Sequence, residues 1–366
     1  MARAASERIR ILQVVSSAAT SGAELHVRTL SKHLHRRGHD VSLIGPPRSE
    51  PCVLEMEGIP LVQTSMKGFG WVRSALLVAR LARQRKADVI HSHLTRATYF
   101  GYVASLLTGK PLVASVHVAT HDPIYKRAAR SHNRLVAVSN YVRGMLHGRG
   151  IPDRFIDTVY NGTDFIELDW SCPRGVHEEF GIPENRQLIG MVGRVCEDKG
   201  HGLMIQAFPE MLKVEPNAHL VFVGRVEPSF QSDIDALVAE PNMRDRVTLT
   251  GNRSDVSRLL DAFRFTAMPS SIETFGLAAI EAMARKRPVV AARVGGLPEI
   301  VRHQQTGLLI DRSAGELAEA ASYLLRNEEE REYMGEMGRR MVEEKFTVHQ
   351  MVERLEAVYS RAIGGA

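Results

Sequence analysis

Short apolar runs alternate with longer amphipathic segments along this 366-residue chain, in two successive series. Short buried strands separated by helices form a parallel sheet that helices cover on both faces, so this alternation restricts the fold strongly. It predicts an α/β protein with two doubly wound parallel-sheet domains in series. The predicted strands are Ile9–Val15, Val41–Ile44, Asp88–His91, Pro111–His117 and Arg134–Val138, then Leu188–Val192, His219–Val223, Val247–Thr250, Phe265–Pro269 and Pro288–Ala291.

The length suits two domains of roughly 100–200 residues each. We expect an N-terminal domain at residues 1–165, a linker without clear periodicity at 166–182, and a C-terminal domain at 183–345. Ligands of open parallel sheets bind beyond the carboxyl ends of the strands, so motifs at strand ends carry the functional information. If two such domains face one another, the expected site is the cleft between them.

The charge balance is mildly basic, with 47 Lys and Arg against 42 Asp and Glu and a pI near 9.2. This suits an anionic substrate or an anionic membrane surface, and it is too weak to indicate nucleic acid. Cys52, Cys172 and Cys196 are isolated, which is typical of a reducing compartment. No apolar run approaches the roughly 20 residues that span a bilayer. We therefore expect a cytoplasmic protein, with peripheral contact to the cytoplasmic membrane face left open.

The block from Met268 to Glu281 combines a strand end, a polar loop and a helix start. Gly276 lets a ligand approach the backbone, and the free amides of the first helical turn form an anion site. Glu281 emerges from a largely apolar helical stripe, where a ribose diol could donate hydrogen bonds to its carboxylate. Glu273, in the preceding loop, is expected to meet a sugar hydroxyl. The alternative is that Glu273 caps the helix and Glu281 pairs with Arg285.

The loop from Gly193 to Gly200 joins a predicted strand to a helix and carries two cations, Arg194 and Lys199. A planar guanidinium and a compact ammonium together suit a diphosphate. Taken alone, such a basic loop is more often a solvated turn. Its place in the same domain and at the same sheet edge as the glutamate block favours the diphosphate.

Taken together and in order, these motifs resemble glycosyltransferase family 4 and its GT-B relatives. The resemblance covers essentially the whole chain and rests on Gly193–Gly200 (G-R-x4-K-G), Pro269–Glu281 (P-S-x2-E-x-F-G-x4-E), Tyr160–Asp164 and Gly295–Glu299. It implies two Rossmann-like domains facing a central cleft, with a nucleotide diphosphate-sugar held mainly by the C-terminal domain. It also implies that the last helix, at residues 346–366, packs back on the N-terminal domain.

The resemblance implies a role for individual residues. Those matching Arg194 and Lys199 hold the diphosphate, the one matching Glu281 holds the ribose, and the one matching Glu273 faces the donor sugar. The expected donor contacts are Gly22, Gly193, Arg194, Lys199, Arg253, Glu273, Phe275, Gly276, Leu277 and Glu281. The residues expected to act in catalysis are His117, Arg194, Lys199 and Glu273.

The roles of two features in the N-terminal half, the Ser21-Gly22 loop and the histidines at strand ends, are less clearly indicated. The family usually shows Gly-Gly where Ser21-Gly22 stands here, so the geometry of that loop, a helix cap or a phosphate contact, is undecided. His91 and His93 form a His-x-His pair, but no Asp or Cys clusters beside them, and the family acts without metal. We expect no metal site. His117 matches the family histidine at the donor-sugar end of the cleft.

The expected activity is hexosyl transfer from a nucleotide diphosphate-sugar to a hydroxyl of a saccharide or lipid-linked acceptor, in cell-envelope or polysaccharide synthesis. A UDP-sugar is the first expectation for the donor and GDP-mannose the second, and the resemblance implies retention of anomeric configuration without metal or other cofactor. A nucleotide-sugar 2-epimerase and a non-catalytic nucleotide-sugar-binding subunit are the alternatives. A nicotinamide oxidoreductase is disfavoured because no G-x-G-x-x-G follows the first strand.

Overall fold

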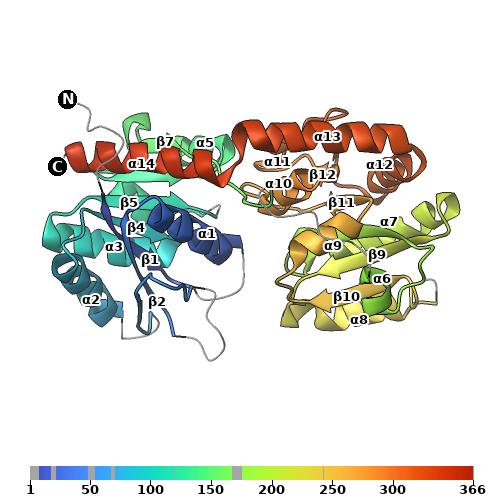
Figure 1. The fold of residues 1–366 in the computed structure, drawn as a ribbon, viewed down its shortest axis with the longest axis horizontal. Coiled ribbons are helices and arrows are strands. Elements are labelled where there is room, and N and C mark those ends of the chain that lie inside the picture. Colours follow the sequence, from blue (N-terminus) through green and yellow to red (C-terminus); the bar gives the residue numbers. More distant parts are fainter. Residues whose placement is uncertain are drawn as a thin grey trace. The chain divides into compact units, whose positions relative to one another are not determined.

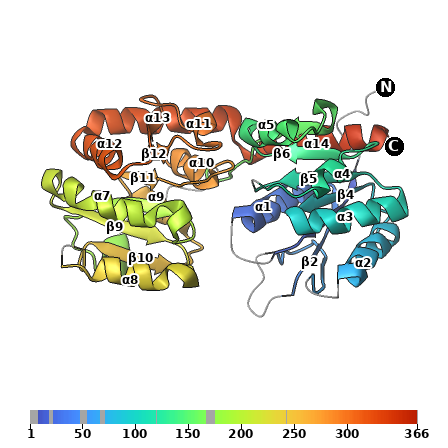
Figure 2. The same ribbon diagram turned by 180° about the vertical axis from the view of Figure 1, so that it is seen from behind.

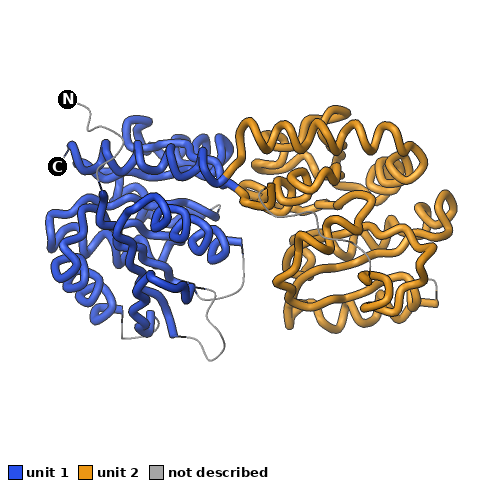
Figure 3. The backbone as a smooth tube through the Cα atoms, viewed as in Figure 1, with its two compact units in different colours: residues 1–162, 348–366 blue, residues 163–347 orange. Residues whose placement is uncertain are grey.

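The computed structural model describes residues 8–17, 22–47, 54–66, 71–118, 120–166, 175–241 and 243–365. The chain divides into two compact units (Figures 1 and 3): unit 1 comprises Met1–Gly162 with Val348–Ala366, and unit 2 comprises Thr163–Thr347. Ser21, Cys52 and Cys172 lie outside the described residues, as does the middle of the predicted linker. The described end of that linker contains the short helix α6 (Val176–Phe180).

Unit 1 is built on a seven-stranded parallel sheet in the order β3-β2-β1-β4-β5-β6-β7. Its strands are β1 (Arg10–Val15), β2 (Asp40–Gly45), β3 (Leu61–Gln63), β4 (Val89–His93), β5 (Leu112–Val116), β6 (Arg134–Ala137) and β7 (Ile156–Thr158). The five predicted strands are confirmed, and the central ones are almost entirely buried because helices cover both faces. The edge strands β3 and β7 were missed, since three residues carry no readable period.

The helices of unit 1 connect successive strands and pack on the sheet. They are α1 (Gly22–Arg36), α2 (Trp71–Gln84), α3 (Thr95–Thr108), α4 (Ile124–Ala128), α5 (Asn140–Gly148) and the C-terminal α14 (Val348–Gly364). Helices α2 and α3 lie side by side (Figures 1 and 2). A short 3-10 helix, η2 (Asp153–Phe155), precedes β7.

The C-terminal helix α14 packs on α1 and on strands β4 and β5. Its apolar stripe, which includes Leu355 and Val358, is buried in the same core as β1 and α1. Polar contacts reinforce this packing: Arg37 donates to Glu356 over 2.8 Å, and the His91 ring lies 2.7 Å from the Tyr359 hydroxyl. The last helix is therefore an integral part of unit 1.

Unit 2 contains a six-stranded parallel sheet in the order β10-β9-β8-β11-β12-β13. Its strands are β8 (Gln187–Val192), β9 (Ala218–Val223), β10 (Val247–Gly251), β11 (Phe265–Met268), β12 (Val289–Ala292) and β13 (Gly307–Ile310). The five strands predicted for this half are confirmed, and β13 is an additional edge strand. Two doubly wound α/β units, as predicted, make up the chain.

The helices of unit 2 are α6, α7 (His201–Val214), α8 (Gln231–Ala239), α9 (Val256–Ala262), α10 (Leu277–Ala284), α11 (Leu297–Ile300), α12 (Ala314–Arg326) and α13 (Glu328–Lys345). Two 3-10 helices, η3 (Glu197–Lys199) and η4 (Pro228–Phe230), lie in the loops that follow β8 and β9. None of the helices in these described ranges is long and apolar enough to cross a membrane.

One helix boundary differs from the sequence-based prediction. The amphipathic pattern at residues 327–362 predicts one continuous helix, although the resemblance implies a separate last helix from residue 346. In the structure α13 ends at Lys345 and α14 begins at Val348. Phe346 is buried, its ring lies edge-on to Phe275 at 5.9 Å, and its carbonyl oxygen accepts a bond from the Thr163 amide. The helix is interrupted because these contacts hold Phe346 out of helical geometry.

Candidate active site

The Gly193–Gly200 loop follows β8 directly and is tied to the loop that follows β9. The Gly193 amide donates to the Val223 carbonyl over 2.9 Å, and the Val195 amide donates to Arg225 over 2.9 Å. In the other direction, the Glu227 amide donates to the Val195 carbonyl over 3.0 Å. These bonds extend the parallel pairing of β8 and β9 past the strand ends, so the loop is positioned by the sheet.

Arg194 and Lys199 each form an ion pair in the structure. The Arg194 guanidinium pairs with the carboxylate of Glu227, from the neighbouring loop, and both side chains remain partly accessible. Lys199 Nζ lies 2.5 Å from Glu273 Oε2, so the two predicted motifs meet through their charged side chains. Both predicted phosphate ligands therefore lie at the same edge of the unit 2 sheet, each balanced by a glutamate.

The two motifs also meet through their backbones. Gly200 has a φ of +81°, and a Cβ there would lie 2.3 Å from the Pro269 carbonyl oxygen. The Ser271 amide donates to the Asp198 carbonyl over 2.9 Å. A side chain at residue 200 would force the loops apart, which explains the glycine in the Lys-Gly sequence.

Glu273 is held from a third side by the Gly295-Gly296 turn. The Gly296 amide donates to the Glu273 carbonyl over 3.0 Å. A Cβ at Gly295, whose φ is +55°, would lie 1.7 Å from that same oxygen. Only glycine permits this close approach, so three loops together fix the position of the Glu273 side chain.

The helix predicted near Gly276 is α10, with Gly276 as its N-cap at a φ of +109°. Phe275 is buried, and Leu277 is the first helical residue. Because the first-turn amides of a helix lack partners within the helix, this end of α10 can bind an anion. A helix of eight residues contributes little by itself, and the nearby Lys199–Glu273 pair gives it functional context.

Glu281 lies on α10, and its pKa is raised to about 8. Loss of water around the carboxyl group is the main cause, and the Asp164 carboxylate adds to it. Arg285, the partner that the sequence left open, instead donates to Asp261 over 2.7 Å, and both of these side chains are buried. At neutral pH the Glu281 carboxyl group is therefore mostly protonated. Its oxygens could accept hydrogen bonds from a ligand.

Arg253, one of the expected donor contacts, takes part in an ion-pair network. Its guanidinium lies 2.8 Å from Asp255 and 2.8 Å from Glu179, and it stacks over the Phe180 ring at 5.5 Å. Arg258 joins the same two carboxylates. These contacts link α6 to the loop after β10, so Arg253 has a clear structural role in unit 2.

The two site residues expected in the N-terminal half lie in unit 1. Gly22 is the first residue of α1, and His117 follows β5 directly. His117 Nε2 lies 3.1 Å from Nδ1 of His93, and the His117 ring packs edge-on against the His26 ring. No sequence pattern associates His26 with this position.

Two known families match successive parts of the chain. Residues 20–165 match the family described as Glycosyltransferase Family 4, and residues 175–341 match Glycosyl transferases group 1. The protein is a glycosyltransferase. The predicted GT-B fold is confirmed by solved structures. The chain matches HepE of Anabaena, solved with UDP and glucose, at a TM-score of 0.84 and 22% identity, and the match covers 95% of this chain and 98% of that one. A glycosyltransferase from Rickettsia africae matches at a TM-score of 0.85 and 22% identity, over 98% and 100%.

Curated relatives of this glycosyltransferase are similar over nearly their full length. N-acetyl-alpha-D-glucosaminyl L-malate synthase of Bacillus anthracis is 29% identical, with 90% of this chain and 91% of the relative aligned. D-inositol 3-phosphate glycosyltransferase of Segniliparus rotundus is 27% identical, over 94% and 85%. These relatives establish the reaction class, glycosyl transfer, for the family.

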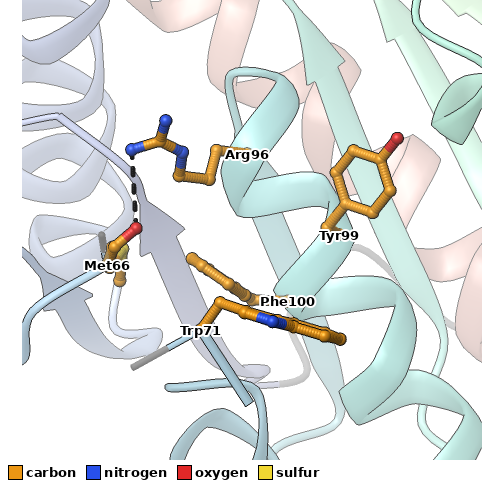
Figure 4. A pocket seen from close by; sticks show the side chains of 5 residues that line it. All are labelled: Met66, Trp71, Arg96, Tyr99 and Phe100. Carbon is orange, nitrogen blue, oxygen red and sulfur yellow. Dashed lines mark hydrogen bonds between the residues drawn. The ribbon is translucent and has the colours of Figure 1, made fainter. Parts of the chain in front are cut away.

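Unit 1 of the glycosyltransferase contains a hollow of about 410 Å³ lined by Met66, Trp71, Arg96, Tyr99 and Phe100. Figure 4 shows the Arg96 guanidinium extending toward Met66, with the rings of Trp71 and Phe100 beneath it in that view. Arg96 donates to the Met66 carbonyl over 3.5 Å, and Tyr99 donates to Asp122 over 2.8 Å. Arg96 and Tyr99 belong to the first turns of α3, which follows β4, so the hollow lies near the carboxyl edge of the sheet.

Two residues of the site were missed by sequence reasoning, and the role of a third was not foreseen. Glu227 pairs with Arg194, and Arg312 donates to the Pro269 carbonyl over 3.3 Å. Asp164, noted only as the end of a motif turn, raises the pKa of Glu281. Glu227 could have been suspected, because it follows a predicted strand. Arg312 precedes a helix far along the chain, and no local pattern marks it.

Proposed function

We propose that the protein transfers a hexose from a nucleotide diphosphate-sugar to a hydroxyl group of an acceptor, with a UDP-sugar the first expectation and GDP-mannose the second. The observation that carries this proposal is the 2.5 Å contact between Lys199 and Glu273. It brings the cation of one motif to the carboxylate of the other, beside the N-terminus of α10. A sugar bonded to a diphosphate presents the two complementary groups next to each other: a phosphate for the cation, and a hydroxyl for the carboxylate.

The diphosphate would be held by Arg194, Lys199 and the first-turn amides of α10. Each cation is paired with a single carboxylate, and a diphosphate carries more charge than a carboxylate. Binding would therefore exchange the glutamates for phosphate oxygens. A guanidinium suits bidentate phosphate contact, and an ammonium suits a point contact. Released from Lys199, Glu273 would be free to accept a hydrogen bond from a sugar hydroxyl.

The ribose would be held by Glu281. Its raised pKa reflects a carboxyl group with few polar neighbours, and a ribose diol supplies two hydroxyl donors. Hydrogen bonds from both hydroxyls to the Glu281 carboxyl group would favour its ionised form, so nucleotide binding would release a proton near neutral pH. This accounts for a glutamate in an otherwise apolar stretch of α10.

For the transfer step we propose retention of anomeric configuration without a metal. The departing diphosphate would accept the proton of the acceptor hydroxyl as the new bond forms on the same face of the sugar. Arg194, Lys199 and the α10 amides would stabilise the developing phosphate charge, and His117 would contact the donor sugar. One preorganised donor of this type is typically worth about 10²–10³ in rate.

The acceptor is proposed to carry negative charge. Arg96 supplies a guanidinium at the rim of an aromatic hollow in unit 1, the unit to which the acceptor would bind. Relatives are named for malate and for inositol 3-phosphate, both anionic and hydroxylated. A lipid-linked or polysaccharide acceptor bearing phosphate or carboxylate groups, as in cell-envelope synthesis, offers the same chemistry.

The direct test incubates the protein with UDP-glucose, UDP-N-acetylglucosamine or GDP-mannose, with and without a panel of anionic hydroxylated acceptors. Release of the nucleoside diphosphate should depend on an acceptor, and NMR of the product should show the donor's anomeric configuration. Conversion of the donor sugar without an acceptor would identify an epimerase instead. Inversion at the anomeric carbon would overturn the proposed mechanism but not the reaction class.

A further inference from the structure

Three histidines from three separate elements converge in unit 1. His26 lies on α1, His93 ends β4, and His117 follows β5. One ring nitrogen from each lies within 4.8 Å of the other two, and the His93 Nδ1 to His117 Nε2 distance is 3.1 Å. We call these three residues the histidine triad.

His26 provides an independent sign that the triad is built for a ligand. Its side chain is 6% exposed, and among the described residues its Nε2 has no hydrogen-bond partner. The ring centroid lies 4.9 Å from that of His117 and 5.8 Å from that of His93, so the ring borders both. A buried polar nitrogen without a partner is costly, and a ligand at this point would satisfy it.

Gln13 fixes the orientation of His93. Its Oε1 lies 2.6 Å from His93 Nε2, and the Gln13 side chain is fully buried on β1. Because the amide oxygen accepts, Nε2 of His93 carries the proton, and Nδ1 presents a lone pair toward His117. Metal-binding histidines commonly donate their second N–H to such a carbonyl or carboxylate oxygen, which fixes the tautomer.

His91 shows why the His-x-His spacing is uninformative by itself. Both of its nitrogens are engaged, Nδ1 with the Tyr359 hydroxyl at 2.7 Å and Nε2 with the Ser115 hydroxyl at 2.8 Å. His93, two residues on, instead joins side chains distant in sequence. The expectation of no metal was based on the pair of His91 and His93, whereas the structure brings together a different set of histidines.

We propose that His26, His93 and His117 bind one Zn²⁺ ion. Three imidazole nitrogens at about 2.0–2.1 Å with an open fourth position form an ordinary zinc environment. Small side-chain adjustments bring the present nitrogens to that geometry. Cu²⁺, Ni²⁺ and Co²⁺ share the preference for imidazole, whereas Mg²⁺ and Ca²⁺ prefer oxygen ligands.

The metal would regulate transfer and take no part in it. Zn²⁺ held by His117 removes that ring from the donor sugar, so bound zinc lowers the transfer rate. This effect rests on the proposed role of His117. The binding of zinc itself does not.

The binding test uses the full chain, stripped with a chelator and dialysed, and titrated with Zn²⁺ by calorimetry and with Co²⁺ by visible absorption. We expect one ion per chain and a tetrahedral Co²⁺ spectrum. His26→Gln and His117→Gln should abolish both signals. Gln13→Leu, which removes only the support of His93, should weaken binding by about 10–100-fold.

Two controls separate this site from adventitious binding and from misfolding. His91→Gln alters a neighbouring buried histidine outside the triad, and His219→Gln alters a buried histidine of unit 2, so both should bind as the wild type does. Circular dichroism checks the fold, and His117, the most exposed of the three, is the variant least at risk. Absence of binding by the folded wild type, or full binding by both triad variants, would overturn the proposal. Tight binding without inhibition would instead contradict the role of His117.

Discussion

Lys199 Nζ lies 2.5 Å from Glu273 Oε2, across two loops whose contacting residues are 74 positions apart in the chain. The pair joins the cation assigned to the leaving phosphate with the carboxylate assigned to the donor sugar. Its side chains are only partly exposed, and the Gly200 and Gly295 contacts hold both loops in place. The side chains proposed to contact the phosphate and the sugar are therefore held in fixed positions relative to each other within unit 2.

Replacing Lys199 with alanine should lower turnover by at least about a hundredfold, because one preorganised charge on the leaving group is lost. Stability should change little, since partly exposed ion pairs contribute about 0–1 kcal/mol. Initial-rate kinetics and a thermal melt measure both effects. Lys213→Ala is the matched control, an exposed lysine on α7 paired with Glu210, and it should leave turnover unchanged. Near-wild-type turnover of Lys199→Ala would remove the proposed role.

Replacing Glu281 with glutamine should weaken nucleotide binding while stabilising the free protein at pH 8. The folded-state pKa of about 8 lies above the ordinary value of 4.5. The stability that this group contributes is therefore fully present below pH 4.5 and is lost as the pH rises through 8. Glutamine does not titrate, so the stability of the variant relative to the wild type should increase as the pH rises over this range. Urea unfolding at pH 5 and pH 8 tests this, and an equal difference at both values would contradict the raised pKa.

Acidification below pH 6.5 should destabilise the protein, and unit 1 more than unit 2. Burial lowers the pKa of His91 to about 3 and those of His117, His201 and His219 to about 4. The unfolded chain takes up protons below pH 6.5 that the folded chain does not, so stability falls as the pH falls. Each such histidine costs about 2 kcal/mol at pH 5.

The two units should differ because the raised pKa of Glu281 makes unit 2 more stable as the pH falls. This offsets the destabilisation caused by one histidine of unit 2. Unit 1 has no such offset from a raised carboxyl pKa among its described residues, and the pKa values of His26 and His93 are lowered as well. Hydrogen exchange at pH 7 and pH 5 should show greater loss of protection in β4 and β5 than in β8 and β9. Equal loss in both sheets would contradict this prediction.

Replacing Leu355 with alanine should destabilise unit 1 by about 2–5 kcal/mol, because the substitution leaves a cavity in the core. Leu355 is 1% exposed and lies among residues of α1 and β1, although it is only eleven residues from the chain end. Glu353→Ala, an exposed neighbour on the same helix, is the control. Denaturant unfolding of both variants measures the difference. Wild-type stability of Leu355→Ala would show that α14 is dispensable for unit 1.

The alternation of strands and helices was readable because the central strands are mostly apolar and the helices are amphipathic. The helix start at Gly276 was readable for a related reason, since glycine follows a polar loop at a strand end. Glu281 could be singled out because a carboxylate in an apolar stripe conflicts with its surroundings. These features all lie within one stretch of chain.

What could not be read depends on contacts between distant segments. The Lys199–Glu273 pair and the convergence of His26 with His93 and His117 arise only when the sheets form. The break at Phe346 has no glycine or proline to mark it, and follows from burial of its ring. The ion pairs of Arg253 could not be read either, because one of its carboxylate partners lies on α6, far away in the sequence.

The central claim is that unit 2 binds a nucleoside diphosphate through its phosphates, and a thermal-shift series tests it most directly. UDP, GDP and ADP are each compared with the matching nucleoside, in the wild type and in Lys199→Ala. At 100 times its dissociation constant, a ligand stabilises the folded state by about 2.7 kcal/mol. We predict that at least one diphosphate raises the melting temperature, that its nucleoside does so far less, and that Lys199→Ala loses the difference. Equal shifts from the diphosphate and the nucleoside, or no shift from any of the three diphosphates, would contradict the account.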